Sequence, residues 1–234
     1  MKLAVIGSTG LVGSQLTDLA TSRGHVVTGV SKDSGVDLLT GKGLDDVLAD
    51  ADAVVNVVQS PNFDQEDSTA FFTTVAKNLG DAATSAGVGR TVVLSIIGVD
   101  RVAASKTDAG TGYDGYYKAK FAQEQATREF SPDPHVVRSA QFHDIARQAI
   151  GWTRDGDTST VPDLAIQPLD VASMVEVVLD VATGDRDGDV VEVGGPRSEH
   201  LAAMSTVYAG YENDDVRVTA GPVGDAVRDG ILLP

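Results

Sequence analysis

The stretch MKLAVIGSTGLVG, residues 1–13, decides the fold. Residues 2–6 form a short apolar run, which is typical of a buried strand. A glycine-rich turn follows, and an amphipathic pattern then predicts a helix from about Gly10 to Ser22. The glycines of the turn have the spacing G-x-x-G-x-x-G and are Gly7, Gly10 and Gly13. A strand, such a turn and a helix in this order indicate a turn that holds a phosphate group.

Each glycine of a phosphate-binding turn has its own physical task. One permits the tight bend, one lets the backbone approach a pyrophosphate, and one lets the helix pack closely on the strand. The amino end of the helix then faces the phosphates, where N–H groups and the helix dipole favour an anion. An ordinary strand-to-helix connection is the alternative, but the second strand expected after Gly24 favours a dinucleotide site. The residues expected at the pyrophosphate are Gly7, Ser8, Thr9, Gly10, Leu11, Val12 and Gly13.

The rest of the chain alternates between strand and helix patterns. Further strands are expected at 25–30, 53–58, 91–95 and 135–138, and helices at 44–49, 67–86 and 116–129. Gly98 to Gly115 is expected to be a polar loop of the length that usually has a function. Weaker patterns predict a helix at 145–151, a turn at 155–157, a helix at 170–182 and a strand at 190–193. This alternation predicts an α/β fold: a doubly wound parallel sheet, the Rossmann fold, with right-handed crossovers.

The length predicts a single domain. A chain of 234 residues lies within the range that one α/β domain can fill. We expect residues 1–138 to form the core Rossmann unit. Residues 139–234 are then expected to complete the sheet and to form a small C-terminal substrate-binding portion that shapes the pocket. The sequence after Pro196 carries the weakest pattern.

The charge of the chain restricts its partners. Lys and Arg total 18 against 34 Asp and Glu, a formal net charge of −16, and such a surface repels nucleic acid and anionic membranes. We therefore expect a small-molecule substrate. The chain has no cysteine and its four histidines lack the spacing of metal ligands, so neither a disulfide nor a metal site is expected. No apolar stretch approaches the roughly 20 residues that span a bilayer, and no signal-peptide pattern opens the chain, so a cytoplasmic location is expected.

Several segments together carry a resemblance to a known family. Besides the glycine turn they are residues 24–27, 51–55, 94–98, 116–120, 137–142, 167–172 and 193–196. With these segments the chain resembles the short-chain dehydrogenase/reductase superfamily in its atypical and extended branches, and within it the NmrA-like NAD(P)-binding group. The resemblance spans nearly the whole chain, and the glycine turn and the segment Pro168-Leu169-Asp170-Val171 are its most specific parts.

The end of the second expected strand bears on the cofactor. NAD-binding members usually place an acid there, which holds the ribose 2′-OH and would repel a 2′-phosphate. Here Ser31 and Lys32 offer a hydroxyl and a cation, which predicts NADP(H). NAD(H) is the alternative. It would be bound if Lys32 were only a solvated charge of the loop and Asp33 turned inward to the ribose. The resemblance places Asp37 and Leu38 at the adenine ring; the full set of expected cofactor contacts beyond the turn is Ser31, Lys32, Ser34, Asp37, Leu38, Val58, Gln59 and Lys120.

The catalytic candidates are Tyr116, Lys120 and Ser95. Tyr116 and Lys120 are four residues apart, so they share a face of the expected helix. The resemblance implies that the tyrosine donates a proton to a carbonyl, that the lysine lowers its pKa and contacts the nicotinamide ribose, and that Ser95 bonds the substrate oxygen. The Y-x-x-x-K spacing alone is weak, and Tyr113, Tyr116 and Tyr117 are alternatively residues that only pack on the sheet.

The function expected from these residues is that of an NADP(H)-dependent oxidoreductase acting on a small carbonyl or quinone-like substrate. An NADP(H)-binding redox sensor without turnover is the main alternative, and an epimerase or isomerase is a third. Substrate contacts are expected from residues 59–61, 98–115 and 141–143. Phe142 and Trp152 either wall an apolar pocket or pack in the core, and His143 is either a proton relay or a surface residue.

Overall fold

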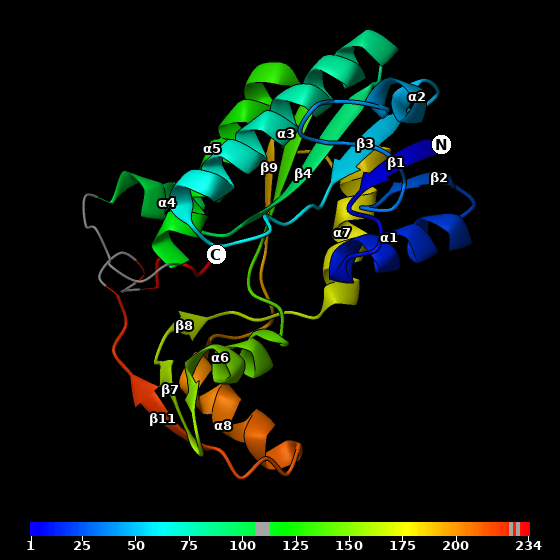
Figure 1. Cartoon of the computed structure of the whole chain (residues 1–234). Coiled ribbons are helices and arrows are strands. Elements are labelled where there is room, and N and C mark those ends of the chain that lie inside the picture. Colours follow the sequence, from blue (N-terminus) through cyan, green and yellow to red (C-terminus); the bar gives the residue numbers. More distant parts are fainter. Residues whose placement is uncertain (106–112, 225–226, 228–229) are drawn as a thin grey trace.

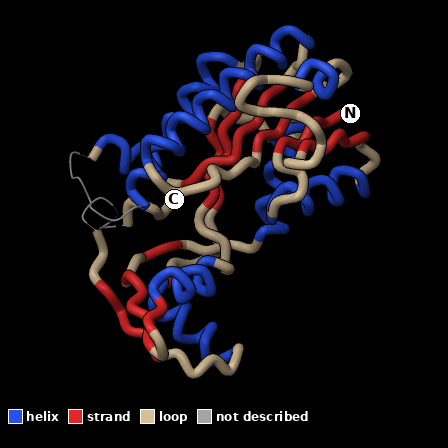
Figure 2. The backbone as a smooth tube through the Cα atoms, viewed as in Figure 1, coloured by secondary structure: helices blue, strands red, loops and turns tan. Residues whose placement is uncertain are grey.

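The computed structural model of the chain describes residues 1–105, 113–224, 227 and 230–234, and within them it has two lobes (Figure 1). The larger lobe is a sheet between helices, and the smaller lobe holds short strands packed on two helices (Figure 2). The larger lobe contains β1 (Lys2–Ile6), α1 (Leu11–Ser22), β2 (Val26–Val30), α2 (Leu44–Leu48), β3 (Ala53–Asn56), α3 (Gln65–Ala86), β4 (Arg90–Ile96), α4 (Val99–Ala104), α5 (Tyr113–Phe130), β5 (Pro134–Ser139), α7 (Val171–Thr183) and β9 (Val190–Val193).

The central sheet has the strand order β2-β1-β3-β4-β5-β9, and all its pairs are parallel. The chain winds outward from β1 in both directions, first to β2 and then across to β3. The carboxyl ends of β1 and β3 therefore form the point at which the winding reverses, where open α/β sheets bind their ligands. The expected fold, a doubly wound parallel sheet, is confirmed.

Helices cover both faces of this sheet, so its four inner strands, β1, β3, β4 and β5, are largely buried, whereas the edge strands β2 and β9 are mostly exposed. Leu3 and Val5 of β1 belong to the apolar cluster under α1 and α7, and Ala4 and Ile6 belong to the cluster under α2 and α3. In Figure 1, α3 and α5 lie side by side on one face and α1 and α7 on the other. This two-sided burial explains why residues 3–6 of β1 and 53–55 of β3 are continuously apolar instead of alternating.

The smaller lobe is assembled from separate parts of the sequence. β7 pairs with β6 in a hairpin and with β11 in parallel, and β8 pairs with β10. Ala149, Val161, Ile166 and Leu201 form its apolar core. Its elements are α6 (Ile145–Thr153), β6 (Arg154–Asp155), β7 (Thr158–Pro162), β8 (Ala165–Ile166), β10 (Glu199–His200), α8 (Leu201–Tyr211) and β11 (Arg217–Gly221).

The structure corrects some expected boundaries. The segment from Gly98 to Gly115, expected to be a loop, begins with the short helix α4. Gly98, which precedes this helix, has a left-handed backbone conformation. Residues 106–112 of the segment lie outside the described part. β3 ends at Asn56, not at residue 58, because the chain turns away there to reach α3. β10, α8 and β11 were not expected at all. In the described part of the chain, no helix is both long and apolar enough to cross a membrane.

Candidate functional site

Two glycines of the turn are required by the packing of the chain itself. Gly7 has a positive φ of 94°, and a Cβ there would lie 3.2 Å from the backbone carbon of Val57. A Cβ on Gly13 would lie 2.1 Å from the Gly7 carbonyl oxygen, which is impossible without a backbone shift. Gly7 therefore lets the turn lie against the loop that follows β3, and Gly13 lets α1 pack against the turn.

Gly10 is different, because nothing in the chain explains it. Its φ of −75° and ψ of 174° suit any residue, and an added Cβ would meet a single atom within 4 Å, the Gly7 carbonyl oxygen at 3.4 Å. α1 also has no side-chain cap and no acid in its first turn, whereas the Asp64 carboxylate accepts two N–H groups at the start of α3. Open space beside Gly10 and an uncapped helix start fit a pyrophosphate.

The end of β2 lies next to this turn, since the N–H groups of Gly7 and Ser8 both donate to the Val30 carbonyl oxygen. The chain then bends sharply: the Ser34 hydroxyl donates to the Ser31 carbonyl oxygen at 2.8 Å. Lys32 is exposed at the bend and forms no ion pair within the described residues. The end of β2 therefore presents a cation close to the glycine turn, as the sequence predicts.

Asp37 and Leu38, expected at the adenine ring, are used locally in this structure. The Asp37 carboxylate accepts the N–H of Leu39 at 2.9 Å and of Thr40 at 3.3 Å. Hydrogen bonds from Thr40 and then from Leu39 lower the pKa of Asp37. Leu38 packs against the apolar cluster under α2 and α3. Contact with an adenine ring stays a prediction for both residues.

The loop after β3 connects the glycine turn with the catalytic candidates. Val57 and Val58 lie against Gly7, and the buried Asn56 side chain holds the loop by accepting the Val58 N–H at 3.2 Å. The next residue, Gln59, accepts a hydrogen bond from the Tyr116 hydroxyl through its Oε1 atom. Three consecutive loop residues thus reach from the glycine turn to the tyrosine.

Tyr116 lies in the first turns of α5 and is 6% exposed. Its ring makes edge-to-face contacts with Phe72 of α3, at 5.8 Å between centroids, and with Phe63 of the loop after β3, at 5.2 Å. Burial raises the pKa of the Tyr116 hydroxyl above its ordinary value. This direction is opposite to the lowered pKa that the resemblance implies.

Lys120 lies one helical turn further along α5 and is 4% exposed. Its Nζ atom donates to the Leu94 carbonyl oxygen at 2.8 Å and to the Gln123 side chain, and it lies 4.8 Å from the centroid of the Phe72 ring. Burial lowers the pKa of Lys120 to about 7, while the nearby Glu124 opposes that shift. The ammonium therefore makes its hydrogen bonds to β4 and within α5, not to the Tyr116 hydroxyl.

Ser95 near the end of β4 is 1% exposed, and its hydroxyl has no hydrogen-bond partner among the described residues. The same holds for the carboxylate of the buried Asp114, whose pKa burial raises. Buried polar groups without partners are uncommon and mark places where a ligand or water completes the bonding. The fold brings Tyr116, Lys120 and Ser95 to neighbouring elements, but it does not join them by hydrogen bonds.

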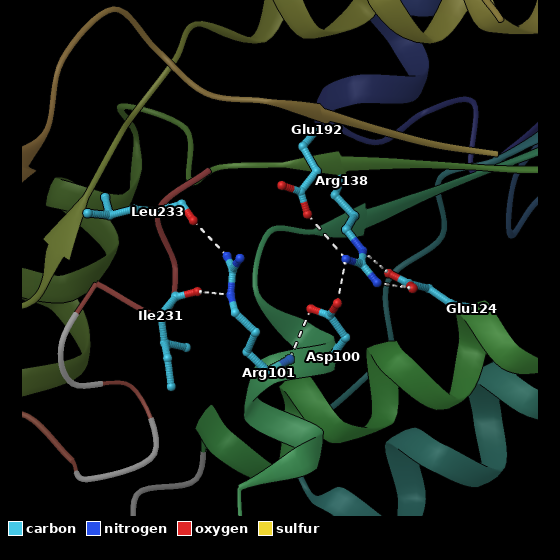
Figure 3. A network of polar contacts seen from close by, with 7 residues as sticks. All are labelled: Asp100, Arg101, Glu124, Arg138, Glu192, Ile231 and Leu233. Atoms are coloured by element: carbon cyan, nitrogen blue, oxygen red, sulfur yellow. Dashed lines mark hydrogen bonds and ion pairs between the residues drawn. The ribbon is translucent and has the colours of Figure 1, made fainter. Parts of the chain in front are cut away.

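A buried ion network fixes α5 on the sheet (Figure 3). The Arg138 guanidinium of β5 donates to both oxygens of the fully buried Glu124, at 3.0 and 2.8 Å. It also bonds Asp100 at 2.9 Å and Glu192 at 3.2 Å. Since Glu124 follows Lys120 by one helical turn, this network sets the position of the helix that carries Tyr116 and Lys120.

The neighbouring Arg101 holds the C-terminal segment (Figure 3). Its guanidinium donates to the carbonyl oxygens of Ile231 at 2.9 Å and Leu233 at 2.6 Å. Leu232 between them is fully buried against Val102 of α4. The segment therefore packs against the helix that follows Ser95 and β4.

The residues expected around the substrate have different positions. Phe142 is half-buried against the core under α1 and α7, so the core alternative holds for it. Trp152 of α6 is 45% exposed and contacts Phe63, with 6.1 Å between ring centroids. Sequence reasoning missed Phe63 and Asn56, and only their position just after a strand end would have indicated them. Within the described ranges, no three or more His, Asp or Glu side chains are grouped as a metal site requires.

Comparison with known proteins agrees with this arrangement. A family model described as NAD(P)H-binding matches residues 7–181. A curated protein, the dTDP-4-dehydrorhamnose reductase of Mycolicibacterium smegmatis, is 26% identical over an alignment 238 residues long. The alignment covers 92% of this chain and 72% of that protein.

Solved structures share the fold over almost the whole chain. A dTDP-4-dehydrorhamnose reductase from Clostridium acetobutylicum has a TM-score of 0.76 at 18% identity, covering 95% of this chain and 84% of that one. UDP-glucose 4-epimerase from Thermotoga maritima, solved with UDP-glucose, has a TM-score of 0.75 at 14% identity, covering 97% and 88%. These matches agree with the resemblance to the short-chain dehydrogenase/reductase superfamily, and the narrower NmrA-like assignment stays a prediction.

Proposed function

Because the chain belongs to the NAD(P)H-binding family, we propose that it is an oxidoreductase of the short-chain dehydrogenase/reductase type that uses NADPH to reduce the carbonyl group of a small substrate. In this proposal the Rossmann lobe binds the cofactor and the smaller lobe shapes the substrate side, so that the two lobes act as one unit. A carbonyl group is also what the names of the two dehydrorhamnose reductases imply for their substrates.

One observation carries the proposal: the loop after β3 touches both halves of the site. It packs on Gly7 of the phosphate-binding turn and, through Gln59, holds the Tyr116 hydroxyl. A dinucleotide whose pyrophosphate lies at the glycine turn extends along the carboxyl ends of the strands toward this tyrosine. Cofactor and proton donor are then neighbours.

The preference for NADPH rests on the end of β2. Lys32 is exposed there and has no acidic partner within the described residues, and Ser31 precedes it. A cation at this position attracts a 2′-phosphate, whereas an inward-facing acid would select the 2′-OH of NADH. Asp33 is exposed one residue further into the bend, and its backbone N–H donates to the Ser31 hydroxyl.

The residues of the chain provide the proton chemistry. A bound reduced nicotinamide supplies the hydride that a carbonyl carbon accepts. The Tyr116 hydroxyl is the group proposed to donate a proton to the carbonyl oxygen, and Gln59, which accepts its hydrogen bond, orients that hydroxyl. Lys120, with a pKa of about 7, lies one turn away on the same helix and is the residue proposed to contact the ribose.

A redox sensor without turnover is the second candidate, and a specific observation favours it. Lys120 bonds to β4 and to its own helix, and Ser95 bonds to no described residue, so hydrogen bonds within the described part of the chain do not join these two residues to Tyr116. A protein that only binds the cofactor would not need such a triad. A sensor must instead bind NADPH and NADP⁺ with different consequences for a partner.

Replacement of Tyr116 by Phe tests the proposal, with Tyr117→Phe on the same helix as the matched control. A panel of aldehydes, ketones and quinones is assayed by loss of NADPH absorbance. Tyr116→Phe should lower kcat by about two to four orders of magnitude and leave NADPH affinity nearly unchanged. Tyr117→Phe should keep full activity. Full activity in Tyr116→Phe would remove this residue from the chemistry, and absence of any turnover by the unmodified protein would favour the sensor.

A further inference from the structure

Three aromatic rings form a row that starts at Tyr116. The Phe63 ring lies edge-to-face on Tyr116, with 5.2 Å between centroids and 66° between planes. The Trp152 ring lies edge-to-face on Phe63, at 6.1 Å and 73°. Phe63 belongs to the Rossmann lobe and Trp152 to α6 of the smaller lobe, so the row joins the two lobes beside the proposed proton donor.

The outer two rings of the row are unusually exposed for their size. Phe63 is 48% and Trp152 is 45% exposed, while Tyr116 is 6% exposed. Single exposed apolar residues are normal on a protein surface, but adjacent ones beside a reactive group mark a binding surface. The faces and edges of aromatic rings favour a flat aromatic partner roughly two- to tenfold in affinity over burial alone.

The charges around the row argue against a phosphorylated substrate. A hollow of about 560 Å³ begins at the residue after Phe63, and Asp64 and Glu66 are among its lining residues. In the described part of the smaller lobe the cations are four arginines, and three of them already bind a carboxylate. These are Arg147 with Asp144 at 2.8 Å, Arg154 with Asp214 at 2.6 Å and Arg197 with Glu199 at 2.7 Å. A nucleoside diphosphate would meet two acids at the start of α3, and among the four arginines only Arg217 has no carboxylate partner in the described part of the chain.

We propose that Phe63 and Trp152 select flat, conjugated carbonyl compounds, of which aromatic aldehydes are the simplest class. The proposal rests on the proposed reductase function and adds its substrate class. The aromatic ring packs against Phe63 and Trp152, and the carbonyl oxygen accepts the Tyr116 proton. Hydride from the reduced nicotinamide forms the new C–H bond, the carbonyl π bond becomes the new O–H bond, and the aldehyde leaves as an alcohol with NADP⁺. Water then reprotonates Tyr116.

A matched pair of aldehydes tests the proposal: naphthalene-2-carbaldehyde, which is flat, and cyclohexanecarbaldehyde, which is not. The variants are Phe63→Leu and Trp152→Leu, which keep an apolar side chain and remove the ring. For each variant kcat/KM for the naphthyl substrate should fall on the order of tenfold more than kcat/KM for the cyclohexyl substrate. Comparing each substrate with itself cancels the difference in intrinsic reactivity between the two aldehydes.

Binding is measured separately from chemistry. Trp152 is the one tryptophan of the chain, so the fluorescence of Tyr116→Phe with bound NADP⁺ reports this position directly. The naphthyl aldehyde should quench it saturably, and this result does not depend on whether either leucine variant folds. Equal losses for both aldehydes, no saturable quenching, or strong competition by dTDP would overturn the substrate class while the reductase function stands. Turnover of no carbonyl compound by the unmodified protein would instead overturn the reductase function.

Discussion

Replacement of Gly10 by valine separates cofactor binding from folding. Gly10 has a backbone conformation open to any residue, and its added Cβ would meet one atom within 4 Å, at 3.4 Å. The fold without cofactor should therefore keep its stability to within about 1 kcal/mol, because the valine also reduces the entropy of the unfolded chain. The branched side chain would occupy the space in which the pyrophosphate must lie, so NADPH binding should be lost.

The size of the effect follows from mass action. NADPH at one hundred times its Kd stabilises the unmodified protein by about 2.7 kcal/mol. For a chain of this length, that free energy raises Tm by roughly 5 to 11 °C. The assay is thermal unfolding of both proteins with and without NADPH. Gly10→Val should match the unmodified protein without NADPH and show almost no rise with it.

Gly13→Ala is the control with the opposite behaviour. Its Cβ would lie 2.1 Å from the Gly7 carbonyl oxygen and 2.8 Å from the carbonyl carbon, both of them backbone atoms. This overpacking should lower the stability of the cofactor-free protein by about 1–3 kcal/mol. If Gly10→Val keeps the full NADPH-induced rise in Tm, the turn is only a connection between strand and helix and the dinucleotide site lies elsewhere.

Two further predictions concern lysines. Lys32→Glu should reduce or reverse a preference for NADPH over NADH measured by calorimetry. Lys2→Glu is the control and should leave the preference unchanged, because Lys2 begins β1 at the end of the strand away from the glycine turn. Equal affinity of the unmodified protein for both cofactors would refute the argument from the end of β2. Burial lowers the pKa of Lys120 from its ordinary value of 10.5 to about 7. Between pH 7 and pH 10.5 the unfolded chain therefore binds more protons at this residue than the folded protein does. The free energy of unfolding should rise with pH over this range, by at most about 1.4 kcal/mol per pH unit. Chemical denaturation between pH 7 and 9 should show this rise in the unmodified protein and in Lys118→Met but not in Lys120→Met; the same slope in all three would refute it.

The Rossmann lobe could be predicted because its signals are local. The spacing of Gly7, Gly10 and Gly13 depends on contacts within one turn, and β1, β3 and β4 each contain a short apolar run close to turn residues. Their order along the chain then determines a doubly wound sheet through the handedness of the crossovers. The position of Lys32 at the end of β2 follows from the same register.

In the smaller lobe only α6 and the turn at 155–157 could be predicted, because the order of the other elements comes from distant pairings. β8 and β10 have two residues each and gain their structure by pairing with each other. α8 is apolar around most of its circumference, with Leu201 buried and Val207 and Tyr211 exposed, so it carries no clear helical stripe.

The states of the candidate side chains were equally beyond the sequence. The four-residue spacing places Tyr116 and Lys120 on one face of α5, but it does not give the direction of a hydrogen bond. Gln59 reaches Tyr116 from a loop that is far away in the sequence. The Gln123 side chain and the Leu94 carbonyl oxygen accept hydrogen bonds from the Lys120 ammonium. The raised pKa of Tyr116 follows from burial, which depends on Phe63 and Phe72 from two other segments.

Because the smaller lobe is built from separate parts of the sequence, the order of synthesis limits when it can fold. β1 to β5 leave the ribosome first, and they are all but one of the strands of the central sheet. The hairpin of β6 and β7 follows, but Val161 and Ile166 stay uncovered until α8 and β11 emerge after β9. The surface of the nascent chain is therefore apolar in this region while roughly fifty more residues are added, and such exposed surface makes a partly synthesised chain prone to aggregation. The smaller lobe can complete its core only once β11 has been made, by which time all six strands of the central sheet are present.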